Sequence, residues 1–229
     1  MILKTLTDVG VKRSENQDNY WSAILDVNGV EAGVICICDG MGGLDKGELA
    51  SKMVVSAIRD NILTYFDFNN IPEVMKKVNS DIISLCKERN IRSMGTTCTV
   101  IMCKEGVYKI CHIGDSRAYI VNSRGYTQLT EDHSAIRKYG ITKRNNLALY
   151  NKYKNKLTRC IGVVENIKPD IFEGTYTSGD AFFLCSDGCW HYFDEKKISL
   201  ESIKDLRVLF SKCIDEGETD NLTAGVLYV

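Results

Sequence analysis

The stretch GVICICDGMGG, residues 33–43, decides the fold of this chain. Its apolar run, residues 34–38, ends on Asp39, and a short apolar run bounded by turn residues is typical of a buried strand. A rigid strand would therefore deliver the Asp39 carboxylate to the rim of a sheet. Three glycines allow a tight turn and a close approach at this point: Gly40, Gly42 and Gly43.

The same pattern returns in AFFLCSDG, residues 181–188, where an apolar run ends on Asp187 and Gly188. A single Asp-Gly pair is usually a simple turn. Two such pairs, each closing an apolar strand, predict two strands that aim carboxylates at one place.

Size and charge narrow the function classes. The 229 residues suit one domain, and no linker divides them, so we expect a single domain over residues 1–229. The 29 basic and 30 acidic residues give a formal charge of −1, which offers no reason to expect nucleic acid or an anionic membrane as a partner. No signal-peptide core is found, and no apolar run reaches the ~18 residues of a membrane span.

The ten cysteines do not form a disulfide or zinc pattern. Many of them sit inside apolar runs, where a free cysteine behaves as a small core residue. These are Cys36, Cys38, Cys98, Cys103, Cys111 and Cys185. Because there is no C-x-x-C pair, neither a zinc ribbon nor a thioredoxin-type motif is supported. We expect a reduced, cytoplasmic protein.

Hydrophobic periodicity predicts an α+β domain with antiparallel sheets and helices packed outside. Strand patterns cover residues 2–9, 20–25, a segment ending at 39, and 97–103, 107–113, 118–121, 171–176, 181–185 and 222–229. Helical patterns cover residues 47–66, a segment beginning near Pro72, and 134–139 and 203–214. Residues 10–18 form a polar loop, and residues 141–156 lack periodicity, which indicates a functional or a mobile loop.

Five aspartates lie beside glycine or asparagine at junctions of loops and strands: Asp18, Asp39, Asp115, Asp187 and Asp220. Each one alone is best explained as a turn or cap residue. Gathered together in their charged form they would repel one another, unless divalent cations neutralised them. All-oxygen ligands select Mg²⁺ or Mn²⁺ rather than zinc.

Eight short motifs carry a resemblance to a known family. In order they are RSENQD (13–18), CDGMGG (38–43), GTT (95–97), HIGDSR (112–117), LTEDHS (129–134), LTRCIG (157–162), LCSDG (184–188) and DNLT (220–223). In this order and spacing the chain, from about Gly10 to Val226, resembles the metal-dependent protein phosphatases of the type 2C serine/threonine class.

The resemblance implies a four-layer α-β-β-α sandwich, two antiparallel sheets flanked by helices, with a two-metal centre at one end. It implies metal ligation by Asp18, Asp39, Gly40, Asp115, Asp187 and Asp220. Within this set Asp39 bridges both ions and the Gly40 carbonyl binds one of them. Asp187 and Asp220 bind the other ion, Asp18 acts through water, and Asp115 helps to hold a weaker third ion. Arg13 grips the substrate phosphate.

The resemblance implies that the enzyme hydrolyses phosphoserine and phosphothreonine in protein substrates. It also implies a monomer that reverses the action of a serine/threonine kinase. Two Mn²⁺ or Mg²⁺ ions roughly 3.5–4 Å apart lower the pKa of a shared water and orient it for attack on phosphorus, without a phosphoenzyme. Arg13 offers phosphate oxygens a planar fork of donors that a lysine could not copy. Asp39 and Arg13 are thus the expected catalytic residues.

The sequence departs from the family pattern at three places, which limits the roles that can be assigned by resemblance. Met41 stands where some members have a histidine proposed as general acid, so no side-chain acid is assigned. Gln17 occupies a position that is acidic in other members. Residues 141–156 align poorly with the flap beside the family's active site. The exposed aromatic and basic residues near this segment either receive the phosphoprotein or form a solvated loop: Tyr139, Lys143, Arg144, Tyr150 and Tyr153.

A cysteine phosphatase is one alternative, because C-x5-R occurs at residues 86–92 and 111–117. Such an enzyme needs a glycine-rich loop around the phosphate and a thiol of low pKa. Cys86 instead ends an apolar helical stripe, and Asp115 would stand inside the second phosphate loop and repel the substrate.

A serine hydrolase built on Ser116, Asp132 and His133 is a second alternative. Adjacent strand residues face opposite ways, so Asp132 and His133 make a poor dyad, and we expect His133 to be an interior hydrogen-bonding residue. His112 is expected on a strand and His191 on a loop.

The third alternative is a catalytically silent regulatory module of the same fold. It would be marked by the loss of a metal carboxylate, and the candidate ligands Asp39, Asp187 and Asp220 are all present.

Overall fold

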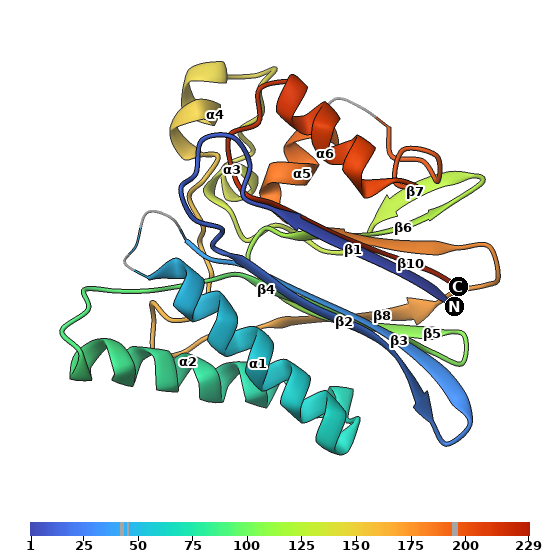
Figure 1. The fold of residues 1–229 in the computed structure, drawn as a ribbon. Coiled ribbons are helices and arrows are strands. Elements are labelled where there is room, and N and C mark those ends of the chain that lie inside the picture. The colour runs from blue at the N-terminus through green and yellow to red at the C-terminus, as the bar shows by residue number, and fades with distance from the viewer. Residues whose placement is uncertain (42–43, 45, 194–196) are drawn as a thin grey trace.

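The computed structural model describes residues 1–41, 44, 46–193 and 197–229. Two five-stranded sheets lie face to face, with helices over both outer faces (Figure 1). The expected four-layer α-β-β-α sandwich is therefore confirmed. Gly42 and Gly43, which were expected to shape the turn after Asp39, lie outside the described residues.

Both sheets are antiparallel throughout. The first has the order β1-β10-β9-β6-β7, with β1 Ile2–Asp8, β10 Leu222–Tyr228, β9 Ala181–Cys185, β6 Arg117–Asn122 and β7 Gly125–Gln128. The second has the order β2-β3-β4-β5-β8, with β2 Asp18–Val27, β3 Val30–Asp39, β4 Cys98–Lys104, β5 Val107–Ile113 and β8 Asp170–Thr175. The final strand β10 thus lies between the first strand β1 and β9.

Strand β3 shows why its sequence is an unbroken apolar run. Ile35 and Ile37 belong to the core between the two sheets, whereas Val34 and Cys36 belong to the core beneath the helices. Because helices cover the outer face, both faces of this central strand are buried, and alternation with polar residues disappears.

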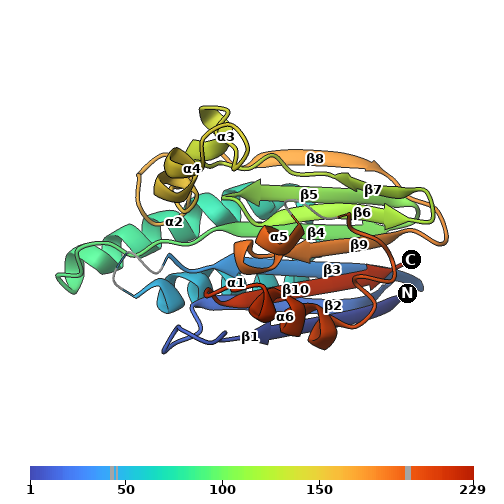
Figure 2. The same cartoon turned by 90° about the horizontal axis from the view of Figure 1, so that it is seen from above.

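The helices divide between the two outer faces (Figure 1). The second sheet is covered by α1 Gly47–Tyr65 and α2 Ile71–Glu88, which are joined by the short 3₁₀ helix η1 Phe68–Asn70. The first sheet is covered by α5 Asp187–Phe193 and α6 Leu206–Asp215. The short helices α3 Ala135–Lys138 and α4 Leu147–Tyr153 lie at the end of the sandwich opposite the chain termini (Figure 2).

The structure corrects several expectations. Residues 141–156 are not simply irregular, because they contain α4, whose N-terminus is capped by the Asn146 side chain accepting the Leu149 N–H at 3.0 Å. His191 lies in α5 rather than on a loop. Helix α6 begins at Leu206, three residues later than expected, since the Asp205 carboxylate caps it. Strand β7 was not expected at all.

Other expectations hold. The hairpin between β2 and β3 turns at Asn28 and Gly29, both of which have positive φ, as a two-residue turn with this sequence requires. All ten cysteines are free and buried. Among the described residues, no helix combines the length and apolar character needed to cross a membrane.

Candidate active site

A cavity of about 540 Å³ opens at the end of the sandwich where β3 ends. Six of the seven predicted site residues line it: Arg13, Asp39, Gly40, Asp115, Asp187 and Asp220. The seventh, Asp18, is buried beside them and accepts a hydrogen bond from the Ser186 hydroxyl at 2.8 Å. The fold therefore brings together residues that are up to 207 positions apart in sequence, the distance between Arg13 and Asp220.

Asp39 is held by its backbone, which leaves its carboxylate available to the cavity. Its N–H donates to the Thr97 hydroxyl at 2.9 Å, and its carbonyl accepts from the Thr97 N–H and the Thr96 hydroxyl, also at 2.9 Å. Asp18 is its partner across β2 and β3, so two carboxylates oppose each other at the strand ends. Such a like-charged pair is unfavourable in an empty sheet.

Gly40 lines the cavity with backbone atoms only. Its N–H donates to the Gln17 carbonyl at 3.1 Å, and a Cβ at this position would lie 2.5 Å from the carbonyl oxygens of both Gln17 and Gly47. No larger residue fits without moving the backbone. The Gly40 carbonyl is thus a fixed oxygen beside Asp39.

Asp187 and Asp220 are brought together by a close contact between the start of α5 and the segment that precedes β10. A Cβ at Gly188 would overlap the carbonyl oxygen of Asn221. The Asn221 side chain accepts the Gln17 N–H at 3.0 Å and donates to the carbonyls of Val9 and Glu15 at 2.8 and 3.1 Å. Asn221 therefore ties the loop that carries Arg13 to the loop that carries Asp220, a role that the sequence did not reveal.

Glu218 is a second residue whose role the sequence did not reveal. Its carboxylate accepts the N–H groups of Thr219 and Asp220 at 2.7 and 3.0 Å, and it contacts His191 Nδ1 at 3.0 Å. Hydrogen bonds from His191 and these amides overcome the effect of burial and lower the pKa of Glu218 to about 2. The ionised carboxylate fixes the backbone of the Asp220 loop.

Burial and mutual repulsion raise the pKa values of the clustered carboxylates. Burial is the main cause for Asp18, whose pKa rises to about 7, and for Asp39 and Asp115, whose pKa values rise well above the usual range. The pKa of Asp187 is raised by burial as well. Neighbouring aspartates add to the effect at each of these positions. Cations in the cavity would reverse this cost and keep the carboxylates ionised.

The donor set fits hard divalent cations. Asp187 Oδ1 is buried and has no hydrogen-bond partner among the described residues, as expected for an oxygen reserved for a ligand. The carboxylates of Asp39, Asp115 and Asp220 and the carbonyl of Gly40 line the same space. An all-oxygen set of this kind suits Mg²⁺ or Mn²⁺.

Arg13 supplies positive charge at this acidic cavity. Its guanidinium forms an ion pair with Asp220 at 2.6 Å, and the side chain is 40% exposed. The hydrogen bond to Asp220 raises its pKa, with further contributions from Asp187 and Asp39. A guanidinium that is held at the rim and partly open to solvent is placed to meet an incoming anion.

Asp115 is backed by an aromatic and basic wall. The indole N–H of Trp190 donates to the Asp115 carbonyl at 2.8 Å, and the Arg117 guanidinium lies 3.5 Å from the centre of the Trp190 ring. Arg117 in turn forms a forked ion pair with Asp132. Arg117 and Asp132 also line a second cavity.

The structure argues against the serine hydrolase. Ser116 is fully buried and shares a hydrogen bond with the Thr97 hydroxyl at 3.0 Å. Asp132 is engaged by Arg117. His133 accepts the Gly114 N–H at 3.1 Å and donates to Asp170 at 2.9 Å, so the expectation of an interior hydrogen-bonding histidine is confirmed.

The structure also argues against the cysteine phosphatase. Cys86 is a buried residue of α2, and Cys111 is fully buried in β5, where its thiol contacts the Met75 sulfur at 3.6 Å. Burial raises the pKa of Cys111 to about 12, the opposite of what a thiolate nucleophile needs.

Comparisons with known proteins agree with this geometry. A sequence profile of the protein phosphatase 2C family matches residues 11–224. The chain is 30% identical over 236 residues to the serine/threonine phosphatase stp of Listeria monocytogenes serotype 4b (strain F2365), covering 95% of this chain and 91% of that protein. It is 34% identical over 203 residues to the protein phosphatase PhpP of Streptococcus pneumoniae serotype 2 (strain D39 / NCTC 7466), covering 82% and 78%.

Solved structures show the same fold. The serine/threonine phosphatase Stp1 from Staphylococcus aureus superposes with a TM-score of 0.84 at 26% identity, over 99% of this chain and 94% of that one. The S. agalactiae serine/threonine phosphatase gives 0.83 at 26% identity, over 100% and 99%. Sequence, architecture and the convergence of aspartates at one end of the sandwich all lead to one assignment: this chain belongs to the protein phosphatase 2C family.

Proposed function

We propose that this protein is a protein serine/threonine phosphatase whose active site is a dinuclear Mn²⁺ or Mg²⁺ centre in the 540 Å³ cavity. One observation carries the proposal. Buried aspartates from both sheets converge there, and their pKa values are raised by burial and by one another, which is costly unless cations are bound.

Each site residue has a role in this proposal. Asp39, the Gly40 carbonyl, Asp187 and Asp220 would hold the two ions, with Asp39 shared between them. Asp18 would act through water, and Asp115 would help to hold a weaker third ion. When bound, the ions supply a water of lowered pKa oriented for attack on phosphorus.

Arg13 binds the substrate phosphate in this proposal. Its guanidinium is already oriented by Asp220 at 2.6 Å, at the rim of the cavity. Two parallel N–H groups can bind two phosphate oxygens at once and so fix the phosphorus in line with the attacking water. No described side chain is assigned as the general acid.

The substrates are phosphoserine and phosphothreonine residues of proteins, made by a serine/threonine kinase. The names of the relatives in Listeria and Streptococcus support this substrate class. We place the enzyme in the cytoplasm, and the ten buried free cysteines support this compartment because free thiols persist in a reducing environment. We further propose that it acts as a single catalytic domain and a monomer.

The test is hydrolysis of p-nitrophenyl phosphate and of a phosphothreonine peptide with added Mn²⁺. EDTA should abolish both activities, whereas iodoacetamide should spare them. Asp39→Asn and Asp187→Asn should each lower kcat by at least about 10²-fold, because each removes a charged ligand. Asp60→Asn, at an exposed helical position, is the matched control and should retain activity.

Binding of Mn²⁺ should be followed independently of turnover, by electron paramagnetic resonance or calorimetry. We expect the two ligand variants to lose Mn²⁺ affinity and the control to keep it. Unchanged activity in Asp39→Asn would overturn the two-metal mechanism. Binding of the phosphopeptide without any turnover by the wild type would instead support the regulatory module.

A further inference from the structure

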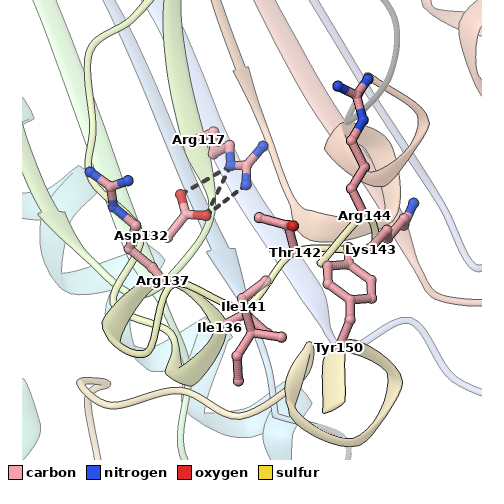
Figure 3. Close-up of a pocket in the computed structure, with 9 residues that line it drawn as sticks. All are labelled: Arg117, Asp132, Ile136, Arg137, Ile141, Thr142, Lys143, Arg144 and Tyr150. Atoms are coloured by element: carbon pink, nitrogen blue, oxygen red, sulfur yellow. Dashed lines mark hydrogen bonds and ion pairs between the residues drawn. The ribbon is translucent and has the colours of Figure 1, made fainter. Parts of the chain in front are cut away.

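A second cavity, of about 350 Å³, lies beside α3 and α4 (Figure 3). Four of the side chains that line it are basic: Arg117, Arg137, Lys143 and Arg144. Among the described residues that line it, Asp132 is the only acidic one. A cavity of this size can hold a small polar group or one side chain of a partner.

The charge of Asp132 is already balanced within the protein. Arg117 Nε lies 3.0 and 3.1 Å from the two carboxylate oxygens, and its NH2 lies 2.7 Å from one of them. Gln128 adds a hydrogen bond at 3.2 Å. Because Arg117 also stacks on Trp190, this pair forms a fixed and electrically neutral wall. The other three basic side chains, Arg137, Lys143 and Arg144, add positive charge to the lining of the pocket.

These three basic side chains frame the pocket from two sides. Figure 3 shows Arg137 on one side and Lys143 and Arg144 on the other, with the Arg117–Asp132 pair between them. Arg137 pairs with Glu131 at 3.0 Å, but both side chains are more than 60% exposed, so an incoming anion can replace this weak contact. An anionic group in the pocket would therefore meet donors on both sides.

The pocket also has an apolar part. Ile136 and Ile141 line it beneath the charged groups, and the Tyr150 ring lies beside Lys143, whose ammonium is 5.4 Å from the ring centre (Figure 3). A ligand with a short aliphatic stem and a charged head fits this division better than a free inorganic ion does.

The pocket adjoins the proposed active site through one hydrogen-bonded unit. Ser134 forms a β-bridge with Leu157, and the Ala135 N–H donates to the Lys156 carbonyl at 2.7 Å. Lys156 and Leu157 line the active-site cavity. On the segment paired with them, Ile136 and Arg137 directly follow Ala135 and line the basic pocket. One extended peptide can therefore reach both cavities.

We propose that this basic pocket binds a second anionic side chain of the phosphoprotein substrate, and that a phosphorylated residue is its preferred occupant. The inference rests on the proposed function, because it needs the first phosphate to be held at the metal site. Arginine forks bind phosphate oxygens in pairs, and a phosphate dianion gains more than a carboxylate from a site of several positive charges. The substrate class is thus proteins phosphorylated at two nearby positions.

The test compares three synthetic peptides of one sequence, in which the second position carries threonine, glutamate or phosphothreonine. A series with the second position about two to six residues from the first covers the reach of an extended chain. For wild-type enzyme we expect kcat/KM to be on the order of tenfold higher for the doubly phosphorylated peptide, mainly through a lower KM. The glutamate peptide should fall between the other two.

Variants assign the preference to the pocket. In Arg137→Gln/Arg144→Gln the ratio of kcat/KM for the doubly over the singly phosphorylated peptide should fall to within about twofold of one. Lys138→Gln, which removes an exposed charge from the same helix as Arg137, is the matched control and should keep the wild-type ratio. Raising the salt concentration to about 0.5 M should also reduce the preference.

A binding measurement separates this inference from the proposed function. In fluorescence anisotropy with labelled peptides, the Asp39→Asn protein should bind the doubly phosphorylated peptide more tightly than the singly phosphorylated one, without turnover. A triple variant that adds Arg137→Gln and Arg144→Gln to Asp39→Asn should lose this preference. If the singly phosphorylated peptide is hydrolysed but the second phosphate brings no gain at any spacing, the inference is wrong and the proposed function stands. If the gain persists in the pocket variant, the inference is wrong as well. If no peptide is hydrolysed, both fail.

Discussion

The carboxylate of Glu218 accepts the backbone N–H of Asp220 at 3.0 Å, so one acidic side chain fixes the main chain of another that is proposed to bind metal. Replacing Glu218 by glutamine keeps the shape but removes the charge that holds these amides and His191. We expect Glu218→Gln to weaken Mn²⁺ binding by about tenfold, as loss of a supporting group around metal ligands typically does.

Calorimetry or electron paramagnetic resonance would measure this Mn²⁺ affinity. Relative to wild type, the rate of Glu218→Gln should be nearly normal at saturating Mn²⁺ and clearly lower at limiting Mn²⁺. A general loss of stability would not give this pattern. Glu201→Gln, whose side chain is 85% exposed, is the control. An unchanged Mn²⁺ affinity in Glu218→Gln would show that the Asp220 loop is held by other contacts.

Gly188→Ala should disrupt the proposed metal site by displacing its backbone, although the added methyl group does not enter the cavity. The new Cβ would collide with the carbonyl oxygen of Asn221, a backbone atom that cannot turn away. We expect the start of α5 at Asp187 to separate from the Asp220 loop, with at least about tenfold loss of activity and a loss of stability of about 1–3 kcal/mol. Gly29→Asn is the control, because Gly29 has φ +80° in a hairpin, nothing lies near its Cβ position, and asparagine tolerates this conformation.

His112 should make the fold sensitive to acid. It is fully buried, with Nε2–H donating to the Glu131 carbonyl at 3.2 Å and Nδ1 accepting the Thr99 hydroxyl at 2.8 Å. Burial, helped by the neighbouring His133, lowers its pKa to about 3. The unfolded chain gains this proton below pH ~6.5 while the folded protein does not, so stability is full above that pH and falls toward pH 3.

The expected cost of this histidine is about 2 kcal/mol between pH 7 and pH 5. Urea unfolding of wild type and His112→Gln at both pH values would measure it. The variant should be less stable than wild type at pH 7, yet should lose about 2 kcal/mol less than wild type on acidification. Equal losses in the two proteins would contradict the assignment.

The cysteines should be unreactive in the native protein. All ten are buried, including Cys36, Cys38 and Cys98, whose sulfur atoms lie within 4.8 Å of one another beneath the helices. Iodoacetamide should therefore label the folded protein slowly and leave activity intact, while all ten sites react in urea. Mass spectrometry at timed intervals gives the number of labelled cysteines. Rapid labelling that parallels loss of activity would instead support the cysteine phosphatase.

Local patterns in the sequence predicted the parts of the fold that depend on local physics. The apolar runs before Asp39 and Asp187 predicted buried strands, and the helical pattern over residues 134–139 predicted α3. The roles of the aspartates came from resemblance and not from these patterns, because any one Asp-Gly pair is equally well explained by a turn. The placement of Asp39 and Asp187 on one cavity depends on two sheets packing face to face.

The parts that were missed depend on partners far apart in the chain. Glu218 acts together with His191, 27 residues earlier, and Asn221 bonds to Glu15 across 206 positions. No spacing rule connects such pairs. Helix α4 was not predicted because its seven residues give too few turns for a clear helical period. Its cap, Asn146, is also a weak signal in an asparagine-rich stretch.

The place of β10 between β1 and β9 has a consequence for how the protein is made. Among the described strands, β1 pairs with β10 alone, so it must wait for β10 to leave the ribosome. Asp220 and Asn221 also emerge at this late stage. A nascent chain would therefore gain phosphatase activity abruptly, only once β10 has left the ribosome, and a stop before Leu222 would leave an inert polypeptide.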